Sequence, residues 1–593
     1  MKVLFFSILF LFSYINTFAA ELIISHGITL NEELMHKKDF KHFNKVNKDA
    51  PKTGTFKRAL YGTYDNFNPF SIKGNNLKSI GYIYDKLLTV SLDETDSYYG
   101  LLAEELEYPT DYSFVKFTIR KNAYWHDKTP ITADDVIFTF NEIMEKNLYF
   151  KNYYSFILSI EKISKYDVKF TFKKNMYNKK NIINIGQMFI IPKHYWKNKD
   201  LSKSTLEIPL GSGPYKIHKH DLGKTVVFKL VDDYWGKSLN VNIGINNFDK
   251  MFFEYFKDQT VAFEAFKVGH FDFIIENDLQ RWNRGYNGKF FEKGYIKKET
   301  QKNSMPAGIS GLFINTSIYP LNDINIRIAL NYAFNYNWIN NNVYFNEYTR
   351  YNSFFSNSDY TCGKPNRNVT KILKEFYPNN KDITNKEFIF PNGTNNRENL
   401  KKSLFYFNKA GFKLKNNKLV NKNNVQLILN IPIYTKMIDK ELNYYKSLLN
   451  RIGVTLNILH VDLPQYQELV RKKDYSLLYS RIIQSSKPGL EQRYYYSSEY
   501  ANQDFSQNMA MIRDKNIDTL LQKITDDSNK DYLKALDKLL LHNWIIIPFG
   551  YDNKIRISYW DKFLWPEGKK DVSVSTWWIN TERENEFKKV IYK

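Results

Sequence analysis

The 593-residue chain has 85 lysines and arginines against 63 aspartates and glutamates, a formal net charge of +22, and a single cysteine, Cys362. This length is more than one hydrophobic core supports, so two or more domains are expected. One cysteine excludes an internal disulfide, and lysines scattered among asparagines, as in KLKNNKLVNKNN, favour a solvated surface over a nucleic-acid patch.

Residues 1–19 have the pattern of a secretory signal peptide. Lys2 precedes an apolar run over residues 3–12, and small residues end the segment at Ala19. The run is shorter than the roughly 20 residues that a membrane-spanning helix needs. No cysteine stands at its end to carry a lipid, and a freely diffusing protein would be lost without an outer membrane. We therefore expect a periplasmic protein.

The first part of the chain predicts alternating strands and helices. Strands are expected where β-branched and aromatic residues cluster, and helices where apolar residues recur at helical spacing. The expected strands are residues 55–60, 114–120, 165–173 and 224–230. The expected helices are residues 76–90, 258–268 and 325–334.

The later part predicts a second α/β segment. A helix over residues 399–410 ends at Gly411, a residue suited to a left-handed cap. A strand at 425–431, a helix at 439–451 and a strand at 454–461 then follow, which is a βαβ order. Residues 364–397, rich in Asn, Pro and Lys, are expected to be an irregular excursion whose phenylalanines still pack: Phe376, Phe388 and Phe390.

The stretch RKNAYWHDKTPITADDVIFTF, residues 120–140, places two carboxylates side by side. Thr132 suits a helix N-cap, and Asp135 stands where the acid of a capping box belongs. Asp134 and Asp135 would lie in the first helical turn, where the helix dipole favours negative charge. Adjacent helical residues point about 100° apart, so an acid/base pair is disfavoured. Residues 126–128 are expected to form a tight turn.

The same stretch resembles the signature of the family 5 extracellular solute-binding proteins, the peptide and nickel binders of ABC importers. The residues that match this signature are Arg120, Trp125, His126, Asp127, Pro130, Thr132, Ala133, Asp135 and Val136. Further pieces follow in family order, namely PLGSGPY (209–215), DYWG (233–236), and Asn315, Thr316, Pro320, Asp323 and Arg327. Other segments are similar to the YejA-like branch, binders of oligopeptides and of the peptide antibiotic microcin C: HFNKVNKDAPKTGTF (42–56), YGLLAEELE (99–107), GQMFIIPKHYW (186–196), NNRENL (395–400) and PGLEQR (488–493).

The resemblance implies an α/β fold with two lobes, the class II periplasmic-binding-protein fold, with an extra inserted subdomain and a hinge. Residues 20–80, 196–300 and 520–593 would form the first lobe, 81–195 the inserted subdomain and 301–519 the second lobe. Ligand would bind in the crevice between the lobes.

Other constellations in the sequence are expected to be structural. His218 and His220 would share one face of a strand, but two imidazoles without nearby acids do not make a metal site. Residues 211–214 are expected to form a tight loop before a strand, and nothing near Cys362 in sequence would activate its thiol. The aromatic runs at 494–496 and 577–578 suit core packing more than a ligand surface. The usual motifs of zinc hydrolases, serine hydrolases and P-loop proteins are missing from the sequence.

By resemblance, a peptide ligand would have its amino terminus gripped by an aspartate of the second lobe. The comparable stretch reads QSSKP, residues 484–488, and lacks the acid. Recognition of a free amine would then move to Glu491, Asp65 or Asp504, or the ligand would have a blocked amino end. The candidate ligand-binding residues are Asn66, Asn68, Trp282, Ser485, Glu491 and Arg493. Arg493 would either meet an anion bidentately or form a surface ion pair.

The sequence thus predicts a monomeric binding protein, not an enzyme, that delivers oligopeptides or peptide-like compounds to an ABC permease in the inner membrane. No cofactor, metal or nucleic acid is expected to take part. The alternatives are a binder of a metal chelate or oligosaccharide, an exported peptidase, and a binder of anionic polymers or membranes that draws on the positive charge.

Overall fold

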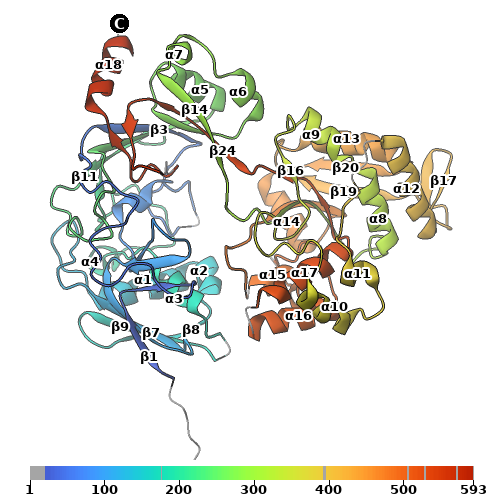
Figure 1. Ribbon diagram of the computed structural model, residues 1–593, viewed down its shortest axis with the longest axis horizontal. Helices are drawn as coiled ribbons and strands as arrows, with labels where there is room; N and C mark the ends of the chain where they lie inside the picture. The colour runs from blue at the N-terminus through green and yellow to red at the C-terminus, as the bar shows by residue number, and fades with distance from the viewer. Residues whose placement is uncertain are drawn as a thin grey trace, which may run out of the picture. The chain divides into compact units, whose positions relative to one another are not determined.

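The computed structural model describes residues 20–71, 73–174, 176–391, 395–489, 491–503, 506–526, 529–568 and 572–591. The expected signal peptide and Asp504 lie outside these residues. The chain divides into two compact units (Figure 1), with unit 1 formed by Met1–Ile275, Asn287–Lys298 and Ile557–Lys593, and unit 2 by Glu276–Tyr286 and Glu299–Arg556. Unit 2 ends at Arg556, whereas the sequence analysis expected the chain to return to the first lobe at residue 520.

The main sheet of unit 1 is ordered β10-β11-β12-β3-β13-β24-β14. Its strands are β10 (Tyr215–Asp221), β11 (Thr225–Leu230), β12 (Lys250–Phe256), β3 (Thr55–Tyr61), β13 (Phe273–Glu276), β24 (Lys554–Trp560) and β14 (Ile296–Lys302). The chain crosses between the units at the end of β13, after Tyr286, and within β14 and β24. Strand β3 lies between β12 and β13 and runs parallel to both, so the carboxyl ends of these strands share one edge.

A second sheet of unit 1 is antiparallel, in the order β1-β6-β7-β9-β8. It consists of β1 (Leu22–Ser25), β6 (Ala103–Pro109), β7 (Phe114–Ile119), β9 (Asp167–Phe172) and β8 (Ile157–Lys162). In β7 and β9 buried residues alternate with partly exposed ones, as the period of a half-covered sheet requires. The strands predicted at 55–60, 114–120, 165–173 and 224–230 are confirmed.

Helix α1 (Ala133–Lys146) begins as the capping-box pattern predicts. The Asp135 carboxylate accepts a hydrogen bond from Thr132 N at 2.9 Å and another from Lys193 N at 2.9 Å. Asp135 is 5 % exposed, and burial raises its pKa, whereas Asp134 points to solvent and pairs with Lys162. The two carboxylates therefore have different structural roles and do not form an acid/base pair.

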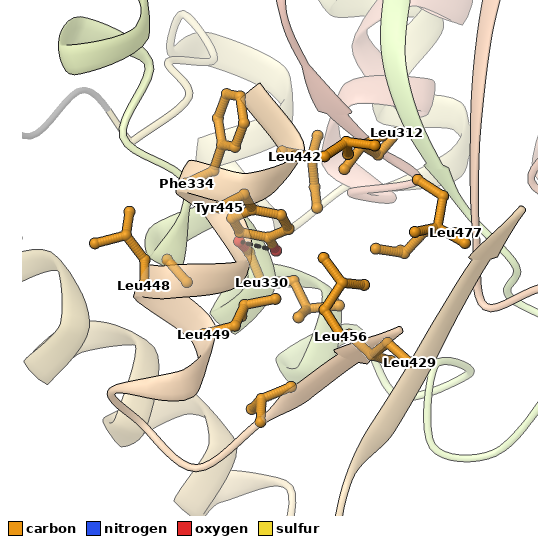
Figure 2. Packing of buried hydrophobic residues seen from close by; sticks show 14 of the residues in the cluster. Leu312, Leu330, Phe334, Leu429, Leu442, Tyr445, Leu448, Leu449, Leu456 and Leu477 are labelled. Carbon is orange, nitrogen blue, oxygen red and sulfur yellow. Dashed lines mark hydrogen bonds between the residues drawn. The ribbon is translucent and has the colours of Figure 1, made fainter. Parts of the chain in front are cut away.

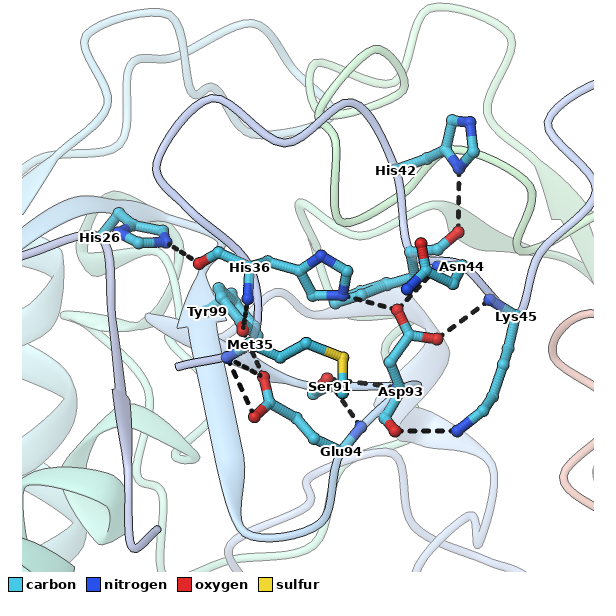
Figure 3. Close-up of polar contacts among 11 residues, drawn as sticks. His26, Met35, His36, His42, Asn44, Lys45, Ser91, Asp93, Glu94 and Tyr99 are labelled. Carbon is cyan, nitrogen blue, oxygen red and sulfur yellow. Dashed lines mark hydrogen bonds and ion pairs between the residues drawn. The ribbon is translucent and has the colours of Figure 1, made fainter. Parts of the chain in front are cut away.

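A polar cluster fixes the first residues of unit 1 against a small sheet of β2 (Gly27–Thr29), β5 (Ser97–Gly100) and β4 (Leu88–Val90). At its centre the buried Asp93 carboxylate accepts from His36 Nε2 at 2.6 Å, Asn44 N at 2.7 Å and Lys45 N at 3.0 Å (Figure 3). Tyr99 donates to the neighbouring Glu94. The cluster is an anchor for the long segment that leads into β3.

The helix predicted over residues 76–90 is wrong. Only a 3-10 turn, η1 (Ile80–Ile83), forms before β4. The Ile83 carbonyl, which a helix would use internally, instead accepts hydrogen bonds from Ser212 N at 2.9 Å and Gly213 N at 2.8 Å. A Cβ at Gly211 would lie 2.0 Å from the same oxygen, so this close approach requires glycine. Tertiary contact thus overrides the local helical pattern.

Unit 2 contains a core on one face of β15 (Ile309–Ile314), which pairs with β21 (Leu477–Ile482) and β22 (Ile546–Pro548). Leu312 and Ile314 pack there with α8 (Ile324–Ala333), α12 (Asn396–Lys409), α13 (Asp439–Asn450) and the parallel strands β19 (Ile428–Ile433) and β20 (Thr455–His460). Figure 2 shows Tyr445 of α13 inside this core, where its hydroxyl donates to Leu330 O at 3.0 Å. The predicted βαβ order and the left-handed cap at Gly411, φ +82°, are confirmed.

The opposite face of β15 covers a second core. Ile309 and Phe313 pack there with α10 (Arg367–Phe376), α16 (Lys515–Asp526) and α17 (Lys530–His542). Because α16 and α17 complete this core, unit 2 continues past residue 520. Burial raises the pKa of the Cys362 thiol to about 12, so the thiol is not activated.

The prediction of an irregular excursion at 364–397 is also wrong, because the segment contains α10 and α11 (Lys381–Asn385). The asparagines that suggested a loop act as helix caps: Asn366 Oδ1 accepts from Val369 N at 2.9 Å, and Asn380 Oδ1 from Ile383 N at 3.2 Å. Phe388 and Phe390 are buried in the second core, as predicted.

The remaining elements connect or cover these layers. Those of unit 1 are α2 (Leu148–Tyr153), α3 (Lys179–Gly186), α4 (Lys193–Trp196), α5 (Gln259–Lys267), α7 (Lys289–Glu292), β25 (Phe563–Leu564), β26 (Trp578–Ile579) and α18 (Thr581–Ile591). Those of unit 2 are α6 (Leu279–Arg284), α9 (Tyr336–Asn342), β16 (Thr349–Arg350), β17 (Lys413–Lys415), β18 (Lys418–Val420), α14 (Leu463–Lys472), α15 (Glu491–Tyr496), η2 (Ser498–Tyr500) and β23 (Gly550–Tyr551). Among the described residues no helix has the length and apolar character needed to cross a membrane.

Candidate ligand-binding surfaces

In unit 1 the carboxyl ends of β3, β12 and β13 define the edge at which open α/β sheets bind ligands. Asn66 and Asn68 follow β3 at this edge, but both are fully buried. Asn66 Nδ2 donates to Asn76 Oδ1 at 2.6 Å, and Asn68 Nδ2 donates to the carbonyls of Leu201 and Lys203 at 2.9 and 2.8 Å. These asparagines hold the loop in shape.

Asp65, the neighbour of Asn66, lies exposed on the same loop. Its Oδ1 accepts from Asn75 N at 2.6 Å, and its Oδ2 accepts from Asn75 Nδ2 at 3.2 Å. The carboxylate remains accessible to solvent while it closes the turn. Asp65 is therefore the unit 1 candidate with an oxygen on the surface.

In unit 2, Ser485 and Glu491 are brought together. Ser485 Oγ donates to Glu491 Oε1 at 2.8 Å, across the start of α15. Beside them, Gln484 and Gln492 are buried and bonded to each other, with Gln492 Nε2 donating to Gln484 Oε1 at 2.8 Å. The QSSKP stretch has no acid of its own, and the Glu491 carboxylate lies beside its Ser485.

The side chains of the other two candidates in unit 2 contact other residues of the same chain. Arg493 Nη2 lies 3.0 Å from Glu499 Oε2, the surface ion pair that the sequence left open. Trp282 on α6 is 8 % exposed, and its ring centroid lies 5.1 Å from that of Tyr286. Next to it Glu276 accepts hydrogen bonds from Arg281 Nε at 2.7 Å and Nη2 at 3.0 Å, so this segment has its own buried ion pair.

Tyrosines that the sequence analysis did not single out lie on and beside the strands of unit 2. Tyr434 follows β19 and is 54 % exposed, and its ring lies 4.7 Å from that of Tyr466. The pKa of Tyr479 on β21 is raised, first by burial and further by Glu441 and Tyr434. Tyr351 and Tyr551 form another ring pair, with centroids 4.9 Å apart. Only the direction and order of the strands bring these residues together, and no local motif announces them.

The remaining histidine motifs show no sign of a metal or catalytic site. His126 Nε2 lies 2.8 Å from Gly213 O, and Lys128 N donates to Trp125 O at 2.8 Å, which confirms the tight turn. His218 and His220 are exposed on β10. Within the described residues, no three histidine, cysteine, aspartate or glutamate side chains gather so as to hold a metal ion.

Comparison with known proteins gives a family match over most of the chain. Residues 97–504 match the model of the bacterial extracellular solute-binding proteins, family 5 Middle. The chain is 33 % identical over 575 residues to a protein of Agrobacterium fabrum described as probable peptide-binding protein YejA, and the match covers 93 % of both chains.

Solved structures of lower identity share the fold. The oligopeptide-binding protein AppA of Bacillus subtilis, in complex with a nonapeptide, has a TM-score of 0.64 at 17 % identity and covers 90 % of this chain and 100 % of its own. NikZ of Campylobacter jejuni, in complex with Ni(L-His), has a TM-score of 0.62 at 20 % identity and covers 86 % of this chain and 94 % of its own. These neighbours have the two-lobed periplasmic-binding-protein fold, and the present chain shares it. The chain therefore belongs to family 5 of the extracellular solute-binding proteins, which bind their ligands without catalysing a reaction.

Proposed function

We propose that the protein is the periplasmic substrate-binding component of an ABC transporter, and that it captures oligopeptides or peptide-like compounds and delivers them to an inner-membrane permease. The observation that carries this proposal is the match over nearly the full length of both chains to a probable peptide-binding protein. The signal pattern of residues 1–19 supports export, and the match to an extracellular family agrees with it.

The mechanism that we propose is closure of the two units on the ligand. Each unit has its own sheets, and the chain passes between the units at the end of β13, after Tyr286, and within β14 and β24. A ligand with better contacts in the closed state shifts the population toward that state. The permease would then recognise the closed form.

Peptide chemistry suits the surfaces at hand. Tyrosine rings can pack against many kinds of peptide side chain, so they do not require one ligand sequence. The buried Gln484–Gln492 pair beside Glu491 is uncharged, so it adds no charge that would compete for the ligand's amino terminus. Among the residues proposed for binding, Glu491 offers a carboxylate for an amino terminus, with Ser485 holding its orientation. Asn66 and Asn68 would act by shaping their loop.

Equilibrium dialysis followed by calorimetry tests the cargo. A mixed library of tetrapeptides to octapeptides, prepared with free and with acetylated amino ends, is compared with pools of oligosaccharides and nickel chelates. We expect retention of peptides and no heat with the other pools. Retention of sugars or chelates alone would overturn the peptide assignment, and cleavage of the peptides at catalytic rates would overturn the assignment as a binder.

The role of Glu491 has its own test. Because hydrogen bonds to charged groups contribute about 1.5–3 kcal/mol, Glu491→Gln should weaken binding of the free-amine peptides by about tenfold or more and leave the acetylated set unchanged. Glu398→Gln, which removes an exposed carboxylate from α12 of the same unit, is the matched control. An equal loss for both peptide sets would show that Glu491 does not meet the amine.

A further inference from the structure

One part of unit 2 carries many lysines and no acid. Residues 399–422, which run from α12 through the hairpin of β17 and β18, contain seven lysines and no aspartate or glutamate. Helix α12 and strand β17 lie side by side (Figure 1), so we call this segment the basic end of unit 2. Its lysines are all exposed: Lys401, Lys402, Lys409, Lys413, Lys415, Lys418 and Lys422.

The exposed face of α12 is centred on a phenylalanine. Phe405 is 55 % exposed. Residues three and four positions apart lie on the same face of a helix, so Lys401 and Lys402 flank Phe405 toward the N-terminus of α12 and Lys409 flanks it toward the C-terminus. The Lys409 Nζ lies 4.8 Å from the centroid of the Phe405 ring. An apolar ring therefore stands on the surface among three ammonium groups.

Two partly exposed tyrosines extend this aromatic surface. The ring of Tyr406 lies 5.3 Å from that of Phe405 and 5.5 Å from that of Tyr332 on α8, centroid to centroid. The Lys402 Nζ lies 5.7 Å from the centroid of the Tyr332 ring. Tyrosine has an apolar body and a polar tip, which suits a boundary between lipid and water.

The positive charge of the basic end is not neutralised locally. In the part of the chain that the structure describes, no carboxylate lies within 4.0 Å of any of the seven ammonium groups. The Lys415 Nζ donates instead to Asn424 Oδ1 at 2.9 Å. Elsewhere in unit 2, by contrast, Lys523 forms an ion pair with Glu375. The basic end is therefore complementary to a surface of negative charge.

We propose that the basic end of unit 2 docks on the surface of an anionic phospholipid membrane. Lysine ammonium groups are attracted to anionic headgroups, and the long lysine stems let the aromatic ring between them reach the acyl boundary. A soluble polyanion would match the charge but would leave the Phe405 ring in water. Docking would hold the protein at the periplasmic face of the inner membrane, where the proposed permease lies. The inference goes beyond the proposed function and does not depend on the ligand.

Co-sedimentation with lipid vesicles tests the docking. The mature protein without residues 1–19 is used, because the apolar run of a signal peptide would itself bind lipid. Vesicles of phosphatidylcholine alone are compared with vesicles that contain about one-third phosphatidylglycerol. We expect binding to the anionic vesicles in about 0.1 M salt and its loss in about 1 M salt, where the Debye length falls from about 10 Å to about 3 Å. No binding, or equal binding to both kinds of vesicle, would overturn the inference.

A triple variant assigns the binding to α12. Lys401→Gln, Lys402→Gln and Lys409→Gln together should weaken binding to the anionic vesicles by about a hundredfold, because each lysine near such a surface contributes about a factor of five. An affinity equal to that of the wild type would overturn the inference.

The matched control removes the same charge from another surface of unit 2. Lys371→Gln, Lys374→Gln and Lys381→Gln together replace exposed lysines of α10 and α11, and should change the affinity by less than about twofold. An equal loss in both triple variants would show that net charge alone attracts the vesicles, and the inference would fall.

The phenylalanine separates a membrane from a polyanion. Phe405→Ser keeps every charge, and it should weaken binding to the anionic vesicles by about tenfold while leaving the affinity for heparin, a soluble polyanion, unchanged. Vesicle binding equal to that of the wild type would identify a general polyanion surface and overturn the inference.

Peptide retention is a separate readout. An unchanged thermal midpoint and unchanged peptide retention show that the variants are folded. Vesicle binding without retention of any peptide would overturn the proposed function and leave the docking inference in place.

Discussion

At the scale of single residues, Asp85 shows how one buried carboxylate organises unit 1. It is 2 % exposed and accepts hydrogen bonds from Tyr234 Oη at 2.9 Å and Trp235 Nε1 at 2.8 Å, while its own amide donates to Ser212 Oγ at 3.1 Å. Asp85→Ala should lower the free energy of unfolding by about 2–4 kcal/mol, because it leaves two buried donors without an acceptor. Urea denaturation followed by circular dichroism measures this, and a loss below 1 kcal/mol would contradict it.

The same residue predicts a pH dependence. Burial raises the pKa of Asp85 to about 7, although its hydrogen bonds pull the other way. The folded state therefore holds a proton that the unfolded state releases near pH 4, so this contribution to stability is present below about pH 4 and is lost as the pH rises through 7. The unfolding free energy of wild type minus that of Asp85→Asn should fall between pH 4 and 8. A constant difference would show that Asp85 does not titrate in this range.

At the scale of elements, the asparagine caps of unit 2 carry measurable stability. Asn395 Oδ1 accepts from Arg397 N at 3.0 Å and Glu398 N at 3.4 Å at the start of α12. Asn395→Ala should cost about 1 kcal/mol, since it leaves helix-terminal amides without an acceptor. Asn395→Asp is the control and should retain the stability, because it keeps the acceptor and adds a negative charge at the helix N-terminus. Equal unfolding midpoints for both variants would contradict the capping role.

The elements also show what local sequence can and cannot predict. Strand patterns, the capping box at Thr132 and the βαβ order of unit 2 are local properties, and the structure confirms them. The conformation of residues 76–90 is set by contacts with Gly211 and Gly213, which lie far along the chain. The helical spacing of its apolar residues therefore predicted the wrong structure. In 364–397 the error was to treat asparagine as a loop residue when it also caps helices.

The candidate site divides in the same way. The sequence singled out both Ser485 and Glu491, and they lie close together because a short loop leads from the first into α15. Asn66 and Asn68 follow β3, but their hydrogen bonds go to segments near 76 and 201 that no spacing reveals. Tyr479 has no local signature, because its position depends on the pairing of β21 with β15.

At the scale of the whole molecule, the division into two units makes it possible to measure whether a bound ligand stabilises one unit or both. Ligand at a concentration of 100 Kd stabilises the bound state by about 2.7 kcal/mol. Amide hydrogen exchange then slows by about a hundredfold, but only where exchange requires an opening that ligand binding suppresses. If closure captures the ligand, the slowing must reach both units. Hydrogen exchange measured by mass spectrometry should then slow at residues 62–71 of unit 1 and at 477–485 of unit 2 when a retained peptide is added. A peptide that the protein does not retain is the control and should change neither segment. Slowing in unit 2 alone would mean that unit 2 holds the ligand without closure, and the proposed mechanism would have to be abandoned.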